Sequence, residues 1–302
     1  GRRRESKFTF PHSTPGHSDT MPSLSIEKAK TVIKEFKLEE EETSIDNTMV
    51  DENYTKFVNE FWTAKQRQAN SIHEISYRAC YKPQLPRFFI DIFTDEGDTV
   101  YDPFAGRGTT LIEAALMNRN IVGNDVNPLS HILIEPRLKI PTLTEVKNRL
   151  NEIEFDQLKA DIDLSMFFHK DTEAEIVSLK NKLKDSDLDN WIRMVATNRL
   201  TGHSVGFFSG YTLPPNQAAS QKSQKVINKR LGIVPPYKNT KEIIMKKSKS
   251  LQRNLSPETI KRLRKVGLSA ILSSKDSRET SHIPDSSINL TVTSPPFLNI
   301  VR

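Results

Sequence analysis

The sequence predicts an α/β fold, built on a parallel, doubly wound sheet that carries a largely helical insert. The stretch "GDTVYDPFAGRGTTLIEAALMNRNIVGNDVNP" contains a short apolar strand ending at Asp102, a glycine loop, a helix from Thr109 to about Asn118 and a second strand ending at Asp125. The strand pattern returns in "SAILSSKD", ending at Asp276, and in "INLTVTSPPF". Strands that alternate with a helix favour parallel pairing.

The remainder of the chain divides by composition. Residues 1–23, rich in Arg, Ser, His and Pro, predict a disordered tail. Residues 24–53 begin with apolar residues at helical spacing and continue into an acidic stretch, which predicts a helix and an acidic linker. Residues 54–140 carry the glycine loop, preceded by a helix that starts near Leu85. Residues 141–263 lack the alternation and are too long for a simple connection, so we expect an insert before the sheet resumes in 264–302.

Composition restricts the class of protein. The chain has 302 residues, 36% of them hydrophobic and 27% charged, as expected for a globular protein. No apolar run approaches the roughly 18 residues of a membrane helix, so we expect no membrane partner and a cytoplasmic location. One cysteine, Cys80, excludes an internal disulfide, and we expect it to be a packing residue. The seven histidines show no ligand spacing, so no metal site is predicted.

Positive charge is concentrated in one part of the predicted insert. Between Ala219 and Lys265 the sequence has 14 basic residues and two acidic ones, whereas the whole chain has a net charge of +6. Such a tract is either a solvated helix face or a phosphate-binding surface, and its concentration favours a polyanionic partner. The lysines expected to neutralise phosphates are Lys246, Lys247 and Lys249.

The glycine loop and the strand-end acids together indicate a nucleoside ligand. The loop lacks the GxGxxG spacing of dinucleotide sites, and Thr109 stands where a triphosphate-binding loop has lysine. An adenosine-type ligand without pyrophosphate remains, and S-adenosylmethionine fits: Asp102 for its ammonium, Asp125 for its ribose and Asp276 for its adenine amino group. A plain α/β turn with solvated acids is the alternative. The predicted cofactor-binding residues of the loop are Pro103, Phe104, Gly106, Gly108 and Thr109.

The corner "TSPPF" predicts a second half of the same site. Two prolines lack amide donors, so the strand ends in a rigid turn beside the ligand crevice. Ser294 Oγ and the Pro295 carbonyl can accept both hydrogens of an exocyclic amine, which directs the nitrogen lone pair toward a methyl donor. Pro296 adds stiffness, and Phe297 offers an aromatic face to a base flipped out of a duplex.

Taken together, "DPFAGRGTT" and "TSPPF" resemble the DNA amino-methyltransferases, which methylate cytosine N4 or adenine N6. The pattern "WIRMVATNRLTGHSVGFFSGYTLPPNQAASQKSQKVINKR" in the insert is similar to a subset of them. The resemblance implies that Tyr81, Lys82 and Pro83, in "SYRACYKPQLP", contact the methionine part of the cofactor. Serine at position 294 is more typical of the cytosine-N4 enzymes, and adenine N6 is the alternative. Arg107 and Phe297 depart from the commoner Ser and Tyr of the family.

The resemblance also implies partners. Double-stranded DNA is the expected substrate, with Asn216 and Gln217 of the insert as candidates for contacts near the target base, and a cognate restriction endonuclease in a bacterial or phage-encoded system. The family fold continues past the catalytic corner. The sequence is therefore expected to be a fragment or to need a second polypeptide that completes the fold.

Two further functions stay open at this point. An RNA or protein-glutamine methyltransferase uses a similar corner, although Asn or Asp is more usual there than Ser294. A non-catalytic DNA-binding or specificity subunit would keep the cofactor fold without turnover.

Overall fold

The computed structural model describes residues 26–35, 46–51, 54–58, 69–77, 80–212 and 219–296. Its helices and strands, in chain order, are α1 (Ile26–Glu35), β1 (Asp46–Asp51), β2 (Tyr54–Val58), η1 (Ser71–His73), α2 (Gln84–Phe93), β3 (Thr99–Asp102), α3 (Thr109–Leu116), β4 (Asn120–Asn124), α4 (Leu129–Ile134), η2 (Glu135–Arg137), α5 (Leu143–Glu152), α6 (Lys170–Lys182), α7 (Asp187–Arg199), α8 (Gln221–Leu231), α9 (Thr240–Gln252), α10 (Pro257–Ser269), β5 (Ile271–Ser273) and β6 (Leu290–Thr291).

A four-stranded parallel sheet forms the part of the molecule that carries both sequence motifs. Its strand order is β5-β4-β3-β6, and every neighbouring pair is parallel. In the middle of the sheet Tyr101 lies opposite Val122 on one side and opposite Thr291 on the other. The order therefore reverses at β3, because β4 and β5 follow it in one direction and β6 lies on its other side. The predicted parallel α/β fold is confirmed, and ligands of such sheets bind at this reversal.

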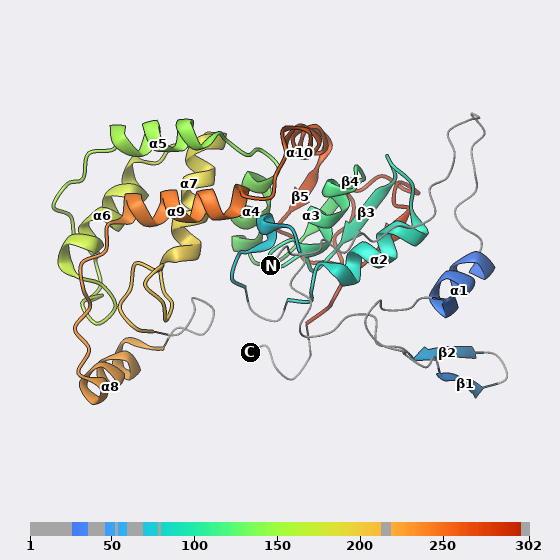
Figure 1. The fold of residues 1–302 in the computed structure, drawn as a ribbon, viewed down its shortest axis with the longest axis horizontal. Helices are drawn as coiled ribbons and strands as arrows, with labels where there is room; N and C mark the ends of the chain where they lie inside the picture. The colour runs from blue at the N-terminus through green and yellow to red at the C-terminus, as the bar shows by residue number, and fades with distance from the viewer. Residues whose placement is uncertain are drawn as a thin grey trace, which may run out of the picture.

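Helix α3 connects β3 to β4 and packs against both strands. All eight of its residues are buried, including Thr110 and Glu113, since α2 and α10 pack against its outer surface (Figure 1). It begins at Gly108, which has φ +76°, and ends near Asn118, also in the left-handed region with φ +62°. The helix thus occupies the place that the sequence predicts, between the glycine loop and the second strand.

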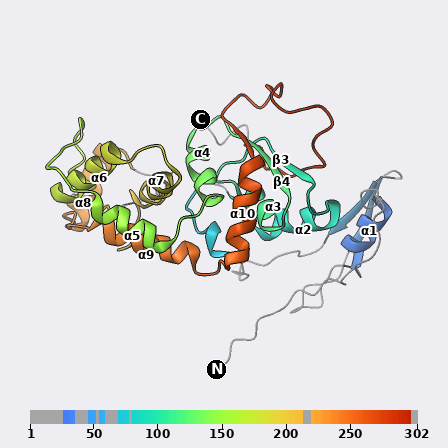
Figure 2. The same ribbon diagram turned by 90° about the horizontal axis from the view of Figure 1, so that it is seen from above.

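Helices α5 to α9 form the other half of the molecule, which lies beside the sheet in two perpendicular views (Figures 1 and 2). Local sequence determines their boundaries. Thr142 and Glu145 form a reciprocal capping box at α5, Ser186 caps α7 through the Asp189 amide, and Gly232 ends α8 with φ +61°. Trp191 is completely buried and donates to Ser248 at 3.0 Å, which joins α7 to α9. The helical character predicted for this region is present.

Two boundaries differ from the sequence interpretation. The segment expected to be an acidic linker contains β1, which pairs antiparallel with β2. The pattern "DNTMVD" has only two apolar residues, which is why the sequence did not predict a strand there. Helix α10 continues past Leu263 to Ser269 and packs against α3 and β4, because Leu263 and Val266 are both buried.

None of the described helices combines the length and apolar character needed to cross a membrane.

The hydrophobic core is continuous between the two halves. It extends from Ile72 and the strands through Trp191 and Phe208 to Val266.

Candidate active site

Asp102 lies at the C-terminal edge of the sheet and connects the two sequence motifs. Its Oδ1 accepts a hydrogen bond from the Thr293 hydroxyl at 2.7 Å and one from the Phe104 amide at 3.1 Å. Its Oδ2 faces the Tyr81 hydroxyl at 3.3 Å. The residue is only 1% exposed, and burial raises the pKa of its carboxyl despite these donors. Three donors contact the carboxylate and join the "TSPPF" corner to the start of the glycine loop, and its contact with an ammonium group stays a prediction.

Tyr81 and Thr110 reinforce this junction. The Tyr81 hydroxyl and Thr110 Oγ1 are in hydrogen-bond contact, and Thr110 Oγ1 also donates to the Val292 carbonyl at 3.1 Å. Burial, with the neighbouring Asp102, raises the pKa of Tyr81, which therefore stays a neutral donor. Lys82, the next residue, is half-buried. The predicted residue Tyr81 thus lies at the site, whereas Thr110 and Thr293 were not singled out by the sequence although both belong to its motifs.

The glycine loop has two positions that exclude a side chain. At Gly108, with φ +76°, an added Cβ would lie 2.4 Å from Ile134 Cγ1. At Gly106, with φ +51°, it would lie 3.2 Å from the Tyr77 ring. A left-handed conformation is costly for other residues, so the backbone favours glycine at both positions. Lack of space adds to this at Gly108, whereas at Gly106 the Tyr77 ring would have to move only slightly. Pro103 and Phe104, which open the loop, are half-buried, and Thr109 is buried at its end.

Asp125 follows β4 and is more accessible than the buried Asp102. It is half-buried, with Oδ2 accepting from the Gly106 amide at 2.7 Å and Oδ1 from the Asn127 amide at 2.9 Å. Each carboxylate oxygen keeps acceptor capacity for a hydroxyl group. Val126 beside it is 76% exposed and offers an apolar surface. This arrangement fits a ribose and the base attached to it.

Asn124 fixes the loops around Asp125 and was missed by the sequence analysis. It is 3% exposed, and its side-chain amide donates to the Lys275 carbonyl at 2.9 Å while its Oδ1 accepts from Ser273 Oγ at 2.7 Å and from the Lys275 amide at 3.0 Å. A polar side chain at the end of a buried strand, directly before the strand-end acid, is the signal that could have identified it.

Asp276 does not end a strand, since β5 stops at Ser273. Its side chain is 42% exposed and accepts from Arg278 Nη2 at 2.6 Å. The Arg278 guanidinium lowers the pKa of the Asp276 carboxyl. If Asp276 accepts a hydrogen bond from an adenine amino group, as predicted, it must do so while its carboxylate is also bonded to the exposed Arg278.

The "TSPPF" corner leaves the sheet beside Asp102. Val292 donates its amide to the Tyr101 carbonyl at 3.1 Å and so continues the β6 pairing. Ser294, Pro295 and Pro296 are exposed at the end of this extension. Phe297 lies outside the described residues. The structure thus brings the "DPFAGRG" loop and the "TSPP" turn to one edge of the sheet, although they are about 190 residues apart in the sequence.

Comparison with known proteins agrees with this arrangement. Residues 16–134 match the family described as "DNA methylase", and residues 78–191 match the "RMKL-like, methyltransferase domain". Type II methyltransferase M.BsoBI of Geobacillus stearothermophilus is 26% identical over 321 residues, covering 93% of this chain. The chain is similar to known DNA methyltransferases over most of its length. The family predicted from the two motifs is confirmed.

Two other relatives match shorter parts of the chain. M.HindIII of Haemophilus influenzae is 44% identical over 52 residues, 17% of each chain. A tRNA (guanine(10)-N2)-dimethyltransferase of Methanocaldococcus jannaschii is 29% identical over 108 residues, 32% of this chain and 31% of that protein. This chain spans 61% of the length of M.BsoBI.

The predicted DNA contacts of this methyltransferase homologue differ in exposure. Lys246 and Lys249 are exposed on α9. Lys247 is 12% exposed and lies 3.7 Å from Glu74, and burial lowers its pKa to about 8. Lys247 is therefore less suited than Lys246 and Lys249 to a phosphate contact, because its ammonium is mostly buried and lies beside the Glu74 carboxylate. Asn216 and Gln217 lie outside the described residues.

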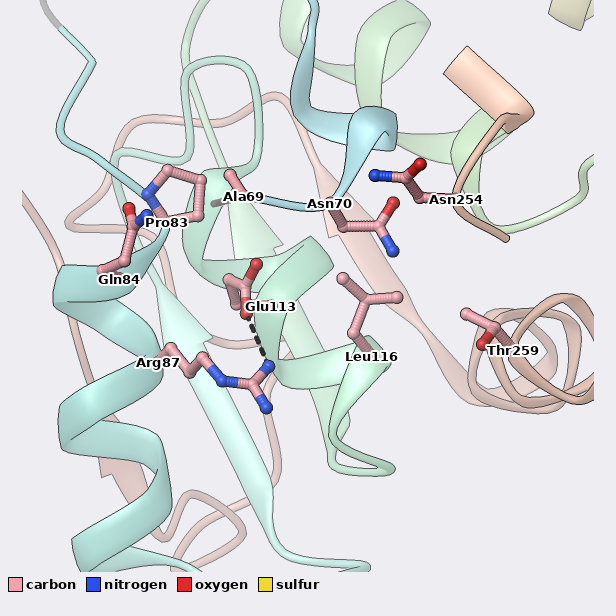
Figure 3. Close-up of a pocket in the computed structure, with 9 residues that line it drawn as sticks. All are labelled: Ala69, Asn70, Pro83, Gln84, Arg87, Glu113, Leu116, Asn254 and Thr259. Atoms are coloured by element: carbon pink, nitrogen blue, oxygen red, sulfur yellow. Dashed lines mark hydrogen bonds and ion pairs between the residues drawn. The ribbon is translucent and has the colours of Figure 1, made fainter. Parts of the chain in front are cut away.

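A cavity of about 390 Å³ lies away from the strand ends, between α2, α3 and the start of α10 (Figure 3). Glu113 at its wall is buried and accepts from His73 Nε2 at 2.6 Å and Arg87 Nη1 at 3.3 Å. Of the residues predicted to contact the cofactor's methionine part, Pro83 lines this cavity, whereas Tyr81 and Lys82 do not. Across the described part of the chain, no three His, Cys, Asp or Glu side chains group as metal ligands would.

Proposed function

We propose that this chain carries the cofactor site and catalytic corner of a DNA methyltransferase that transfers a methyl group from S-adenosylmethionine to cytosine N4 in duplex DNA. The observation that carries the proposal is the 2.7 Å hydrogen bond between Thr293 and Asp102, which joins the glycine-loop motif to the corner motif. Hydrogen bonding to a buried carboxylate fixes geometry, and methyl transfer depends on fixed geometry.

The residues at the sheet edge fit the cofactor in distinct ways. Asp125 would accept hydrogen bonds from the ribose hydroxyls, and Val126 would pack against adenine, because the first is a half-buried acceptor and the second an exposed apolar side chain. Lys82 would attract the carboxylate of the methionine part. Asp276 would serve the adenine amino group if Arg278 shared its carboxylate. S-adenosylmethionine supplies a methyl group activated by a sulfonium.

The corner would orient the target base. Ser294 Oγ and the Pro295 carbonyl would accept the two hydrogens of the cytosine amine, and Phe297 would stack on the flipped base. Ser294 is exposed, which allows a base to approach it. A neutral serine acceptor, in place of the carboxylate that Asp would supply, is the basis for preferring cytosine N4 to adenine N6. DNA approaching this edge would meet the exposed lysines of α9, Lys246 and Lys249. Restriction-modification systems pair such an enzyme with an endonuclease, and we extend that expectation to this chain.

The decisive experiment is transfer of labelled methyl from S-adenosylmethionine to unmethylated duplex DNA, with tRNA in parallel, followed by mass analysis of the digested nucleosides. N4-methylcytosine supports the proposal, and N6-methyladenine contradicts the base assignment alone. Labelled tRNA without labelled DNA contradicts the substrate class. Absence of product, with cofactor binding intact, would support the non-catalytic DNA-binding subunit.

Two substitutions divide the site. Asp125→Ala should weaken cofactor binding by about tenfold or more, because a hydrogen bond to a charged group contributes about 1.5–3 kcal/mol. Ser294→Ala should leave cofactor binding unchanged and slow methyl transfer. Equal effects of both variants on both quantities would contradict the division of roles.

A further inference from the structure

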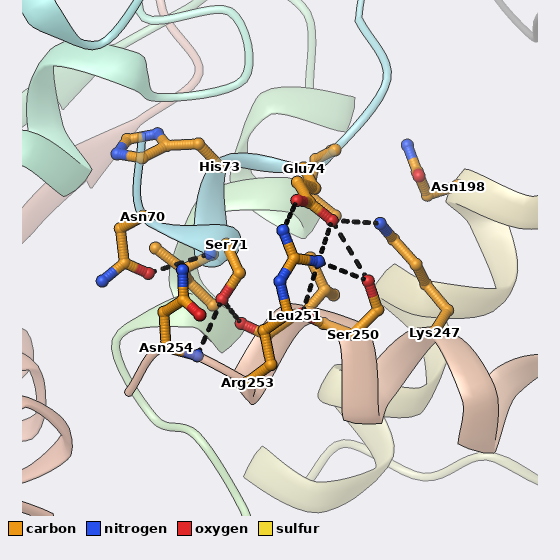
Figure 4. A network of polar contacts seen from close by, with 12 residues as sticks. Asn70, Ser71, His73, Glu74, Asn198, Lys247, Ser250, Leu251, Arg253 and Asn254 are labelled. Carbon is orange, nitrogen blue, oxygen red and sulfur yellow. Dashed lines mark hydrogen bonds and ion pairs between the residues drawn. The ribbon is translucent and has the colours of Figure 1, made fainter. Parts of the chain in front are cut away.

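Residues 70–77 are here called the bridging segment. Figure 4 shows its contacts with the C-terminal end of α9, and hydrogen bonds from Arg107 join it to the glycine loop. The segment contains the single turn η1. Ser71, Ile72, His73 and Ile75 are buried, whereas the side chain of Glu74 is 39% exposed. It belongs to neither sequence motif. Its polar groups are nevertheless bonded on both sides, and these contacts suggest a role in placing the cofactor loop.

On the helical side, Glu74 is the principal contact. Its carboxylate accepts from Arg253 Nη1 at 2.9 Å and from Ser250 Oγ at 3.1 Å, and Lys247 Nζ lies 3.7 Å away. Burial opposes the charge of Glu74, but the bonds from Arg253 and Ser250 outweigh it, so the pKa of the carboxyl lies below its ordinary value. Ser71 adds a second anchor by donating to the Leu251 carbonyl at 2.8 Å.

On the other side, two arginines hold the segment against the glycine loop. Arg107 Nη1 donates to the carbonyls of His73 at 3.2 Å and Ile75 at 2.7 Å. Arg137, completely buried, donates from Nη1 to the Ile72 carbonyl at 3.4 Å and from Nη2 to the Arg107 carbonyl. Burial lowers the pKa of Arg137 to about 9, so it remains charged at neutral pH. The carbonyls on both sides of Glu74 are therefore the acceptors of Arg107.

We propose that Glu74 is a positioning residue for the cofactor loop. Lys247 and Ser250 on α9, with Arg253 directly after that helix, hold the Glu74 side chain. The backbone carbonyls on either side of Glu74 hold Arg107, and Arg107 belongs to the loop that contains Gly106. Tyr77, at the end of the bridging segment, already packs against Gly106. The inference rests on the proposed function, since it assumes that the loop binds S-adenosylmethionine. It adds that an ion-pair network outside that site sets its affinity.

The test measures binding of S-adenosylhomocysteine to the whole chain by calorimetry. Glu74→Gln keeps the shape of the side chain but removes its charge, and we expect the Kd to rise about fivefold. Asp163→Asn is the matched control, because Asp163 also pairs with a lysine, Lys225 at 2.8 Å, on an exposed surface with no contact to the bridging segment. Its Kd should equal that of the wild type.

A double-mutant cycle separates positioning from general destabilisation. Arg107→Met removes the guanidinium that is bonded to the carbonyls of the bridging segment. Adding Glu74→Gln to Arg107→Met should therefore not change the Kd further. An effect of Glu74→Gln that is undiminished by Arg107→Met would overturn the proposal, as would an unchanged Kd in Glu74→Gln. If the wild type did not bind S-adenosylhomocysteine, both the proposed function and this inference would be rejected. If the wild type and all variants bound it with equal Kd, only this inference would be rejected.

Discussion

The edge of the sheet and the surface of the helical half use polar residues in opposite ways. At the sheet edge, Asp102 and Asn124 are 1% and 3% exposed, and each accepts or donates several hydrogen bonds at defined distances. On the helical half, Lys225 and Asp163 form an ion pair in which both side chains are more than half exposed. Buried polar groups fix a geometry because an unmet partner is costly, whereas exposed charges act mainly through their number and are screened by salt.

This difference indicates how each region would respond to change. Single substitutions at the sheet edge should have large and specific effects on folding and on the cofactor site. Substitutions on the helical surface should be small individually and should depend on ionic strength. The following predictions test that contrast, beginning with the largest effect.

Gly108→Ala should reduce the free energy of unfolding by about 2–4 kcal/mol, because it combines a left-handed backbone with a Cβ 2.4 Å from Ile134. Gly232→Ala is the control, since Gly232 also has positive φ but has no atom within 4 Å of an added Cβ. Its loss should be about 1 kcal/mol. Urea unfolding of both variants measures the two values, and similar losses would show that space at the glycine loop is unimportant.

Thr293→Val should cost about 1–3 kcal/mol of unfolding free energy, because it leaves the buried Asp102 carboxylate without its shortest donor. Thr293→Ser keeps the hydroxyl and should lose less than 1 kcal/mol. The same urea experiment applies. If the Val and Ser variants were equally stable, the link between the two motifs would contribute nothing to the fold.

Lys247 provides a pH-dependent test at the boundary between the two regions. Its pKa is lowered by burial to about 8, below that of an unfolded lysine, so the unfolded state binds more protons between pH 8 and about 10.5. Stability should therefore rise with pH across this window by up to about 3 kcal/mol. In Lys247→Met this rise should be absent. Parallel slopes for wild type and variant would contradict the buried position of the ammonium.

The double substitution Lys246→Gln with Lys249→Gln should weaken DNA binding about threefold to tenfold at moderate salt and reduce the slope of log K against log salt by about 2. Lys225→Gln is the matched control, because the charge of Lys225 is already balanced by Asp163. Fluorescence anisotropy at several salt concentrations gives the slopes. An unchanged slope in the double variant would falsify the assignment of α9 to phosphate contact.

The sequence predicts the sheet and its motifs well, for a local reason. The strands around Asp102 and Asp125, the glycine loop and helix α3 follow from short-range periodicity and from residues that only one backbone conformation accepts. The bonds of Asn124 and Thr293 could not be predicted, because they depend on which distant loops meet at the sheet edge. The burial of Lys247 was missed for a similar reason, since its neighbour Glu74 lies 173 positions earlier in the chain.

The pairing of β6 with β3 also bears on the order of folding. Tyr101 pairs with Val122 in β4 and with Thr291 in β6, so one contact closes a short loop and the other closes a loop about nine times longer. Chain entropy makes the second closure about 2 kcal/mol less favourable. We expect the amide of Val292 to gain protection from pulsed hydrogen exchange after the amides of β4. The glycine loop would then be complete before its catalytic partner arrives, and synthesis from the ribosome would impose the same order.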